Sequence, residues 1–276
     1  MGNIALPVAF PGPAGSFSQQ AAAAFFGEGA ALRPFGTFEE TLLALLQGEA
    51  EYAVLPIENS YTGAVSHTYD LLVRHRLAIV GEHLEPVVHH LLGVPGASLA
   101  DIREVHSHPQ ALEQCRAFLS ARPHMTPVPS LNTALSARSV AAAGKPSQAA
   151  LAGRLAAALY GLSFLQEEVQ DSLDNTTRFV VVGRDMLPLA PPDKASITFF
   201  VSNQAGSLAR VLTCFARHGV SLSKIESRPI PGRPWEYFFF ADFEEILDEA
   251  QLAGALQAAA GYTRELRLLG RYAKAR

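Results

Sequence analysis

The segment that most constrains the fold is Asn175-Thr176-Thr177-Arg178-Phe179, which continues directly into Val180-Val181-Val182-Gly183. A short uninterrupted apolar run predicts a strand buried on both faces, which is typical of a sheet covered by helices. Two hydroxyls and an arginine stand where this strand begins. Because arginine keeps its proton, a guanidinium beside a covered sheet needs an anionic partner or water. The partner is either a structural carboxylate, Asp171 or Asp174, or a bound anion.

The bulk properties describe a well-cored protein long enough for two domains. Of its 276 residues, 49% are hydrophobic and 17% are charged, which excludes a disordered chain. The net charge of -4 gives no electrostatic footprint for nucleic acid, so we expect no nucleic-acid partner. Two distant cysteines, Cys115 and Cys214, favour a reducing compartment. We find no signal-peptide pattern and no membrane-spanning stretch, and therefore expect a cytoplasmic protein without membrane contact.

Strand-like and helix-like segments alternate through the first two-thirds of the chain. Thr37 and Glu40 form a capping box that begins one helix, and Gly48 ends it. The alternation predicts an α/β fold with mainly parallel strand pairing. The predicted strands are 4–10, 52–55, 78–80, 87–94 and one ending at 105, and the predicted helices are 19–24, 37–47, 65–74, 110–118, 133–143 and 148–159.

A different pattern follows the proline-rich connector at 188–192. Strand-like segments at 196–201, 220–225, 235–243 and 265–269 alternate with helices near 208–215 and 246–260. The order βαββαβ predicts a ferredoxin-like unit. We therefore predict one domain over residues 1–188 and a second, smaller domain over residues 194–276.

Two polar segments follow predicted strands and are candidates for ligand binding. The loop 11–18 opens a helix, whose N-terminus suits an anion such as a carboxylate; the alternative is a turn capped by Ser16 or Ser18. The segment 56–63 offers Glu58, Asn59 and Ser60 beyond the end of a strand, where ligands of open α/β sheets bind. Its alternative is a turn that caps the next helix.

Three further segments carry polar side chains. In the segment 106–115, alternating histidines suggest a metal, but no ligand spacing recurs, so we expect Ser107 and Gln114 to face a cleft and no metal to bind. His89 and His90 lie in an apolar run, which favours packing or surface roles over catalysis. A polar helix start at 129–134 includes Thr133. Several such helix starts around one arginine suit a small ligand with more than one carboxylate.

Taken in chain order, these segments resemble the prephenate dehydratase family over essentially the whole chain. The blocks that carry the resemblance are Gly12–Ser18, Pro56–Gly63, Ser107–Gln110, Thr177–Phe179 and, near the C-terminus, Glu226–Pro229. The resemblance implies an enzyme of phenylalanine biosynthesis that converts prephenate to phenylpyruvate, water and carbon dioxide. It also implies a two-lobed, periplasmic-binding-protein-like catalytic domain, with lobes of roughly 1–82 plus 165–188 and 83–164.

The resemblance further implies a C-terminal ACT domain that binds phenylalanine as a feedback inhibitor, usually at a subunit interface, so we expect a homodimer or homotetramer. Two departures from the family pattern, at Ala205 and Ser207, bear on phenylalanine affinity. The expected catalytic residues are Thr177, Glu58 and Asn59. The expected substrate-binding residues are Arg178, Ser107, Gln114, Ser60, Phe179, Ser16 and Thr133. The expected effector-binding residues are Asn203, Gly206, Leu208, Glu226, Ser227 and Arg228.

The implied reaction fits these residue types. Aromatisation of the ring drives the loss of water and carbon dioxide, so no cofactor is expected. Arg178 is predicted to clamp a substrate carboxylate, and Thr177 to donate a proton to the departing hydroxyl. Two alternatives stay open from the sequence: an arogenate dehydratase, which acts on the amino-acid analogue of prephenate, and a non-catalytic cytosolic amino-acid sensor.

Overall fold

The computed structural model describes residues 6–27, 29–230, 232–244 and 249–275. They form two compact units, each assembled from several stretches of the chain. The first unit takes residues 1–44, 59–63 and 85–177, and the second takes residues 45–58, 64–84 and 178–276. The chain leaves one unit for the other within strand β3 (Tyr52–Asn59), after Glu58, and within strand β11 (Thr176–Gly183), after Thr177.

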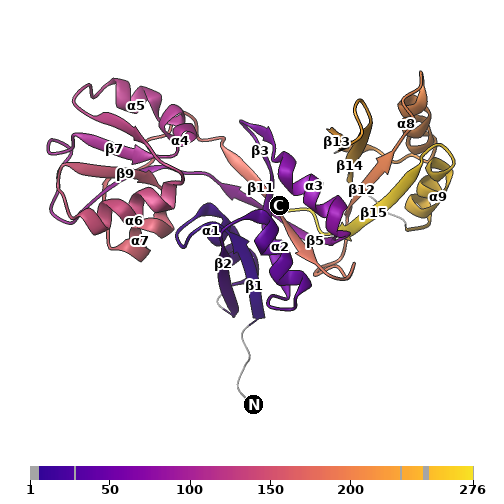
Figure 1. Cartoon of the computed structure of the whole chain (residues 1–276), viewed down its shortest axis with the longest axis horizontal. Helices are drawn as coiled ribbons and strands as arrows, with labels where there is room; N and C mark the ends of the chain where they lie inside the picture. Colours follow the sequence, from indigo (N-terminus) through magenta and orange to yellow (C-terminus); the bar gives the residue numbers. More distant parts are fainter. Residues whose placement is uncertain (1–5, 28, 231, 245–248, 276) are drawn as a thin grey trace, which may run out of the picture. The chain divides into compact units, whose positions relative to one another are not determined.

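A mixed five-stranded sheet forms the centre of the first unit (Figure 1). Its strand β7 pairs in parallel with β8 and β9, whereas β6 pairs antiparallel with β9 and β10. In spatial order the strands are β10 (Ser163–Gln166), β6 (His90–Gly93), β9 (Gln148–Ala152), β7 (Glu104–Ser107) and β8 (Thr126–Pro129).

Helices cover both faces of this sheet because its central strand is apolar on both sides. Ala149 and Leu151 of β9 pack in a cluster with residues of α4 (Pro109–Gln114) and α5 (Arg116–Ser120). Ala150 and Ala152 point to the other face, into a cluster with α6 (Thr133–Ala143) and α7 (Arg154–Tyr160). Strand geometry explains the division, since successive side chains point to opposite faces.

The N-terminal part of the chain begins with a parallel pair of strands, β1 (Leu6–Pro11) and β2 (Ala30–Phe35). Helix α1 (Phe17–Phe26) connects them, and α2 (Phe38–Leu46) follows. The predicted capping box is present: the Glu40 backbone N–H donates to Thr37 Oγ1 and the Thr37 N–H donates to Glu40 Oε2, each at 3.1 Å. The predicted strand start at Ile4 lies outside the described residues.

The structure corrects several predicted elements. Residues 148–159 were expected to form one helix, but they form strand β9 and then helix α7, separated by Gly153. The alanine-rich segment is a good helix former, yet burial at the centre of a sheet overrides that propensity. The predicted helix 110–118 is divided into α4 and α5 at Cys115. Strands β2, β8 and β10 were not predicted; prolines interrupt the first two.

In the second unit, strands β3, β11 and β5 (Ala78–Pro86) are neighbours in that order. Strand β11 is the predicted buried strand, and its residues Val180, Val181 and Val182 are fully inaccessible. Helix α3 (Ser66–His75) precedes β5, after the short strand β4 (Gly63–Ala64). Strand β3 is longer than predicted and extends through Pro56 to Asn59, so Glu58 and Asn59 lie in the strand rather than in a loop after it.

The C-terminal part of the second unit has the predicted ferredoxin-like order βαββαβ. Its sheet has the order β13-β14-β12-β15, and each neighbouring pair is antiparallel. The predicted helix start at 246–248 lies outside the described residues. The elements are β12 (Lys194–Phe200), α8 (Ser207–Arg217), β13 (Leu222–Pro229), β14 (Tyr237–Glu244), α9 (Glu249–Ala260) and β15 (Glu265–Tyr272).

The two faces of this C-terminal sheet differ in polarity, although both are buried. Ala195, Ile197 and Phe199 point toward α8 and α9, which lie on one side of the sheet (Figure 1). The alternating residues Lys194, Ser196 and Thr198 point to the other face and are at most 4% exposed. Helix α3 packs against that polar face: Tyr69 contacts Phe240 edge-on at 4.7 Å, and Asp70 accepts two hydrogen bonds from Arg228. None of the helices in the described ranges is long and apolar enough to cross a bilayer.

At Gly270 the backbone of this sheet lies close to the backbone of strand β5. A Cβ added to Gly270 would lie 1.9 Å from the carbonyl oxygen of Ile79, in strand β5. Two backbones can approach this closely only where no side chain intervenes, so strand β15 requires glycine at this position.

We predict that Gly270→Ala destabilises the protein by about 1–3 kcal/mol or more, because the backbones of β15 and β5 must separate. Gly254→Ala, in helix α9, is the matched control, since its added Cβ would lie at an ordinary 3.5 Å from His218. The control should unfold at the same or a higher denaturant concentration than wild type. Equal unfolding midpoints in denaturant for the two variants would show that the close approach at Gly270 does not affect stability.

Candidate active site

Asn59 is the hub of a buried polar cluster in the first unit. Its Nδ2 donates to Thr177 Oγ1 at 2.9 Å and to Asn175 Oδ1 at 2.7 Å. Its Oδ1 accepts from the backbone N–H groups of Tyr61 and Thr62 at 3.0 and 3.1 Å, which closes the turn that follows β3. Asn59 and Thr177 are 8% and 9% exposed. The structure therefore brings together two of the three predicted catalytic residues.

The hydrogen bond from Asn59 determines what the Thr177 hydroxyl can do. Because Oγ1 accepts from an amide, its own proton must point elsewhere. Among the hydrogen bonds of the described residues, no acceptor takes that proton. The arrangement thus presents a hydroxyl that accepts one hydrogen bond from an amide and whose proton is available for donation.

The cluster continues from Asn175 to two further side chains. Asn175 Nδ2 donates to Gln114 Oε1 at 3.0 Å, and the ring Nε2 of His89 lies 3.1 Å from the same oxygen. Gln170 Oε1 accepts from the backbone N–H of His89 at 3.0 Å. Burial lowers the pKa of His89 to about 4. The hydrogen bond with Gln114 opposes this shift, and the charge of His90 lowers the pKa slightly further. The ring is therefore neutral at pH 7.

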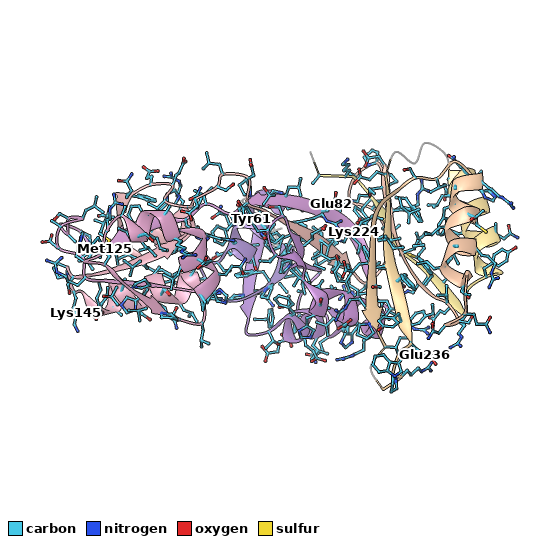
Figure 2. All side chains as sticks on the ribbon, turned by 90° about the horizontal axis from the view of Figure 1, so that it is seen from above. Tyr61, Glu82, Met125, Lys145, Lys224 and Glu236 are labelled. Carbon is cyan, nitrogen blue, oxygen red and sulfur yellow. The ribbon has the colours of Figure 1, made fainter. Side chains whose placement is uncertain are left out.

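A cavity of about 240 Å³ adjoins this cluster within the first unit. Gln114 and Asn175 belong to its wall, whereas Asn59 and Thr177 do not. Two acidic residues on the wall have partners: Glu113 pairs with Arg116 at 3.4 Å, and Asp171 accepts from the Ala117 backbone N–H at 3.1 Å. The wall consists of Tyr61 (labelled in Figure 2), Glu113, Gln114, Gln170, Asp171, Ser172 and Asn175.

The other predicted residues of the first unit form different contacts. The Ser107 hydroxyl donates to the Leu151 carbonyl at 2.7 Å, and Ser60 Oγ donates to the Asp174 carbonyl at 3.0 Å. Ser16 caps α1 by accepting from the Gln19 N–H, and Thr133 is the first residue of α6. Roles for these four side chains in substrate binding stay predictions.

Two of these helix N-termini lie side by side. A Cβ added to Gly12 would meet Ser16 Oγ at 3.6 Å and Asn132 Nδ2 at 4.0 Å. Asn132 caps α6 by accepting from the Ala134 N–H at 2.8 Å. Gly12 has φ +94°, a backbone conformation that favours glycine, so the backbone rather than the available space explains glycine at this position.

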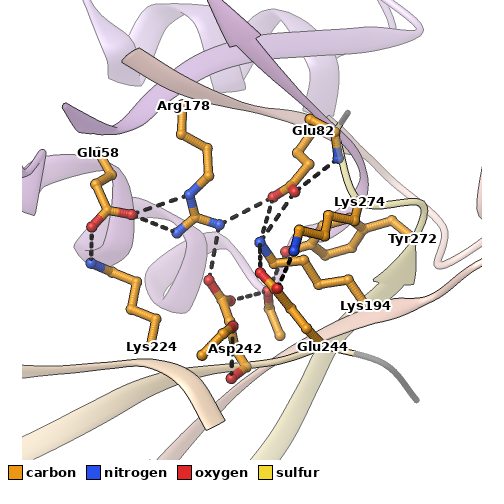
Figure 3. A network of polar contacts seen from close by, with 12 residues as sticks. Glu58, Glu82, Arg178, Lys194, Lys224, Asp242, Glu244, Tyr272 and Lys274 are labelled. Atoms are coloured by element: carbon orange, nitrogen blue, oxygen red, sulfur yellow. Dashed lines mark hydrogen bonds and ion pairs between the residues drawn. The ribbon is translucent and has the colours of Figure 1, made fainter. Parts of the chain in front are cut away.

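Glu58 and Arg178 belong to the second unit, where they join a buried ionic cluster (Figure 3). Arg178 donates to Glu58 Oε2 through Nε at 3.2 Å and Nη2 at 3.1 Å. Its Nη1 lies 3.2 Å from Glu82 Oε2 and 2.9 Å from Asp242 Oδ2. The partners are therefore three carboxylates rather than Asp171 or Asp174, the structural partners considered from the sequence. The predicted role of Arg178 as a substrate clamp stays a prediction.

The ionic cluster extends across β5 and the C-terminal sheet. Lys194 Nζ lies 2.9 Å from Glu82 Oε2 and 3.2 Å from Glu244, and Lys224 Nζ lies 2.6 Å from Glu58. Lys274 also pairs with Glu244. Four basic and four acidic side chains thus balance one another, which is the condition under which buried charges are tolerated. The ionic cluster consists of Arg178, Lys194, Lys224, Lys274, Glu58, Glu82, Asp242 and Glu244.

The cluster fixes the ionisation of Glu58. Burial by itself raises its pKa, but the hydrogen bond from Lys224 and the charge of Arg178 hold the pKa below its usual value. Glu58 is therefore a carboxylate at neutral pH and has no proton to give. The neighbouring predicted residue Phe179 is 2% exposed and belongs to the core of the second unit.

The predicted effector residues lie in the C-terminal domain. Gly206 precedes α8 with φ +79°, and Leu208 packs against the domain's apolar core. Asn203 and Ser227 are exposed. On β13, Arg228 binds Asp70, and Glu226 lies 4.0 Å from Lys224. A role of these six residues in phenylalanine binding stays a prediction.

The sequence reasoning missed several members of both clusters. Asn175 belongs to the Asn175–Phe179 segment, and its position two residues before Thr177, on the same face of an extended chain, was the available signal. The apolar run around His89 predicted a packing or surface role, and nothing in it indicated a hydrogen-bond partner distant in sequence. Glu82, Lys194 and Asp242 carry no motif; charged residues within apolar strands were the only hint.

The histidines of the 106–115 segment have local structural roles. His106 Nε2 lies 3.2 Å from Glu104, and His108 Nδ1 accepts from the Gln110 N–H, which caps α4. Within the described ranges, no three or more His, Cys, Asp or Glu side chains are grouped closely enough to hold a metal ion.

Comparison with known proteins places the chain in a family. The sequence profile of prephenate dehydratase matches residues 8–187, and that of the ACT domain matches residues 195–261. A bifunctional chorismate mutase/prephenate dehydratase from Aquifex aeolicus is 36% identical over 270 residues, which cover 98% of this chain and 74% of that protein. The chain therefore belongs to the prephenate dehydratase family and carries a C-terminal ACT domain.

Two solved structures share the fold over almost the whole chain. A prephenate dehydratase from Arthrobacter aurescens in complex with L-Phe is 34% identical with a TM-score of 0.88, covering 98% of this chain and 90% of that one. GqqA, described as a novel type of quorum quenching acylase, is 36% identical with a TM-score of 0.89, covering 97% and 98% of the two chains. The predicted fold class, α/β with a C-terminal ferredoxin-like ACT domain, is confirmed.

We predict that His89 makes the protein less stable in acid. Its folded-state pKa of about 4 lies below the ordinary value of 6.5, so the unfolded chain binds the proton more tightly. As the pH drops from 6.5 to 4, protonation of His89 should lower the free energy of unfolding by about 3 kcal/mol.

The measurement is urea unfolding of wild type and His89→Phe across this pH range. The variant keeps an aromatic ring against Phe17, whose centroid lies 5.6 Å from that of His89. Its free energy of unfolding should depend less steeply on pH than that of wild type. Parallel pH profiles for the two proteins would contradict a buried neutral His89.

Proposed function

We propose that this chain catalyses the decarboxylating dehydration of prephenate to phenylpyruvate, with Thr177 as the proton donor. Membership of the prephenate dehydratase family supports the reaction. The observation that carries the assignment to Thr177 is its hydrogen bond from Asn59, which leaves the hydroxyl proton available for donation. The reaction takes place in phenylalanine biosynthesis, and the enzyme is a carbon-oxygen lyase.

The proposed step balances without an oxidant or reductant. The bond between the ring and its carboxylate breaks, carbon dioxide departs, and the electron pair of that bond enters the ring. The ring becomes aromatic as the C–O bond to its hydroxyl breaks. Thr177 gives its proton to the leaving oxygen, which departs as water, and the threonine recovers a proton from solvent. A positioned proton donor contributes about 10²- to 10⁴-fold in rate.

Glu58 and Asn59 act in this proposal by positioning rather than by proton transfer. Asn59 is an amide that orients the Thr177 hydroxyl, and Glu58 is an ionised carboxylate bound to Arg178 and Lys224. Thr177 and Arg178 are consecutive in a strand, so their side chains leave opposite faces. For Arg178 to clamp a substrate carboxylate, that carboxylate must replace one of its three protein partners. Neutral donors near Thr177 are therefore the better candidates for substrate binding.

We predict that Thr177→Ala lowers kcat by about 10²- to 10⁴-fold, while KM changes little, because the variant removes the donor and leaves the binding groups in place. Thr177→Ser keeps the hydroxyl and should retain much of the turnover. The measurement is phenylpyruvate formation from prephenate under saturating conditions. An alanine variant with wild-type kcat would remove Thr177 from the role of acid.

We also propose that phenylalanine inhibits the enzyme through the ACT domain. The ACT match and the relative solved with L-Phe support this regulation. The ionic cluster joins the ACT sheet to Arg178 and Glu82, so removing the domain would leave buried charges without partners. Point variants in the full chain are therefore better tests than truncation. The homodimer or homotetramer and the cytoplasmic location stay predictions.

We predict that phenylalanine lowers the rate of prephenate turnover by the wild-type chain and that Asn203→Ala requires a higher concentration for half-inhibition. Asn203 is exposed and its Nδ2 makes only a long 3.5 Å contact with the Trp235 carbonyl, so its replacement removes a ligand contact rather than a structural bond. Arg217→Ala, at the exposed end of α8, is the control and should be inhibited like wild type. Equal inhibition of all three proteins would place the effector site elsewhere.

Three other activities are distinguished by simple assays. The carboxylates of Glu113 and Asp171 on the cavity wall suit the ammonium group of arogenate, so rates on arogenate and prephenate must be compared with the same preparation. Phenylalanine binding without turnover of either substrate would indicate a sensor. An acylase, the activity described for GqqA, needs an activated nucleophile. Thr177 instead receives a hydrogen bond from an amide, which cannot act as a base.

A further inference from the structure

The orientation of the amide groups in the first unit follows from two backbone donors. The N–H groups of Tyr61 and Thr62 both point at one atom of the Asn59 side chain. A backbone N–H can only donate, so that atom is the oxygen Oδ1 and the other is the nitrogen Nδ2. Asn59 therefore has one permitted orientation, and its NH₂ group faces Asn175 and Thr177.

Each further side chain of the cluster is oriented by the one before it. Because Asn59 donates to Asn175, the atom that accepts is Oδ1, and Asn175 turns its Nδ2 toward Gln114. Gln114 must then present Oε1, 3.0 Å from that nitrogen. The second group at Gln114 Oε1 is His89 Nε2, so the neutral His89 ring carries its proton on Nε2. The turn at 59–62 thus sets the direction of the side-chain hydrogen bonds that connect Asn59, Asn175, Gln114 and His89.

The side-chain nitrogen of Gln114 is left without a partner inside the cluster. Its oxygen is occupied by two donors, Asn175 and His89, and Gln114 forms part of the cavity wall. The group that remains for a ligand in the cavity is the NH₂, which offers two donors and no charge.

A second glutamine on the same wall also has its side-chain oxygen occupied by a hydrogen bond. Gln170 Oε1 accepts from the His89 backbone N–H, and its Nε2 is buried without a hydrogen-bond partner among the described residues. A buried donor without a partner costs about 1–3 kcal/mol. The Gln170 nitrogen is inaccessible to solvent, so the amide nitrogen of Gln114 is the donor that a ligand in the cavity can contact.

We propose that Asn175 and His89 are positioning residues that turn the amide nitrogen of Gln114 into the cavity, where it donates to a substrate carboxylate. This inference rests on the proposed function, because the carboxylate is that of prephenate. It explains how the cavity would bind an anion although its described wall residues include no basic side chain: the chain supplies oriented neutral dipoles in place of a positive charge.

The test is Asn175→Asp, which keeps the oxygen that accepts from Asn59 but replaces the Nδ2 donor by a second oxygen. Facing that oxygen, Gln114 must turn its NH₂ toward residue 175 and its carbonyl toward the cavity. KM for prephenate should then rise about tenfold or more, the effect of losing one hydrogen bond to a charged group. Because the contact between Asn59 and Thr177 is kept, kcat should fall by a smaller factor than KM rises. A fall in kcat that equals or exceeds the rise in KM would overturn the proposal.

His89→Phe and His90→Phe form a matched pair. Both keep an aromatic ring, against Phe17 and Phe164 respectively, but only His89 contacts Gln114. His89→Phe should raise KM more than His90→Phe does, and equal KM values for the two variants would overturn the role of His89. Wild-type turnover of prephenate in the same assay establishes the reaction itself, so an inactive wild type would reject the proposed function rather than the hydrogen-bond directions.

A spectroscopic measurement tests those directions without turnover or substitution. Nitrogen NMR of histidine-labelled wild-type protein distinguishes the two neutral ring tautomers from the cation. The proposal requires His89 to be neutral with its proton on Nε2 at pH 7. A proton on Nδ1 alone, or a doubly protonated ring, would overturn it.

Discussion

The hydrogen bond from Asn59 Nδ2 to Thr177 Oγ1 is the interaction on which the candidate site depends. A threonine hydroxyl rotates freely and is both donor and acceptor, so by itself it has no defined role in proton transfer. The amide removes that ambiguity by donating to one of the two lone pairs, which directs the hydroxyl proton away from Asn59. Asn59 is in turn fixed by two backbone N–H groups of the turn that ends β3. The backbone therefore sets the direction of the hydroxyl through a single side chain.

Arg178, the residue after Thr177 in strand β11, connects that strand to the ACT domain. Arg178 leaves the opposite face of β11 and binds Asp242 of the ACT sheet together with Glu58 and Glu82. The polar face of that sheet is buried against α3 and β5, and Gly270 permits the close backbone approach between β15 and β5. The proposed proton donor and an ionic contact to the regulatory domain thus occupy consecutive positions of one strand.

Much of the fold was predictable because it depends on local patterns. The capping box at Thr37, the strand after Thr177 and the βαββαβ order of the C-terminal domain each follow from residues close in sequence. The prediction failed where tertiary burial overrides local preference, as in the alanine-rich strand β9. It also missed the edge strands β2 and β8, whose prolines mask the strand pattern.

The candidate site was predictable in its residue types but not in its contacts. Asn59, Gln114 and Thr177 were singled out from their motifs, yet Asn175 joins them through side-chain bonds across more than fifty residues of sequence. The structural alternative for Arg178, an ion pair with Asp171 or Asp174, considered only nearby carboxylates, whereas its partners come from β3, β5 and β14. Contacts of this range require the folded topology.

A double-mutant cycle between Asn59 and Thr177 tests the central claim most directly. The rates to compare are kcat/KM for prephenate of wild type, Asn59→Ala, Thr177→Ala and the double variant. If Asn59 acts by orienting Thr177, its replacement should cost little once the hydroxyl is gone, and the double variant should be about as active as Thr177→Ala. Losses that multiply in the double variant would contradict the account, because they would show that the two side chains act independently.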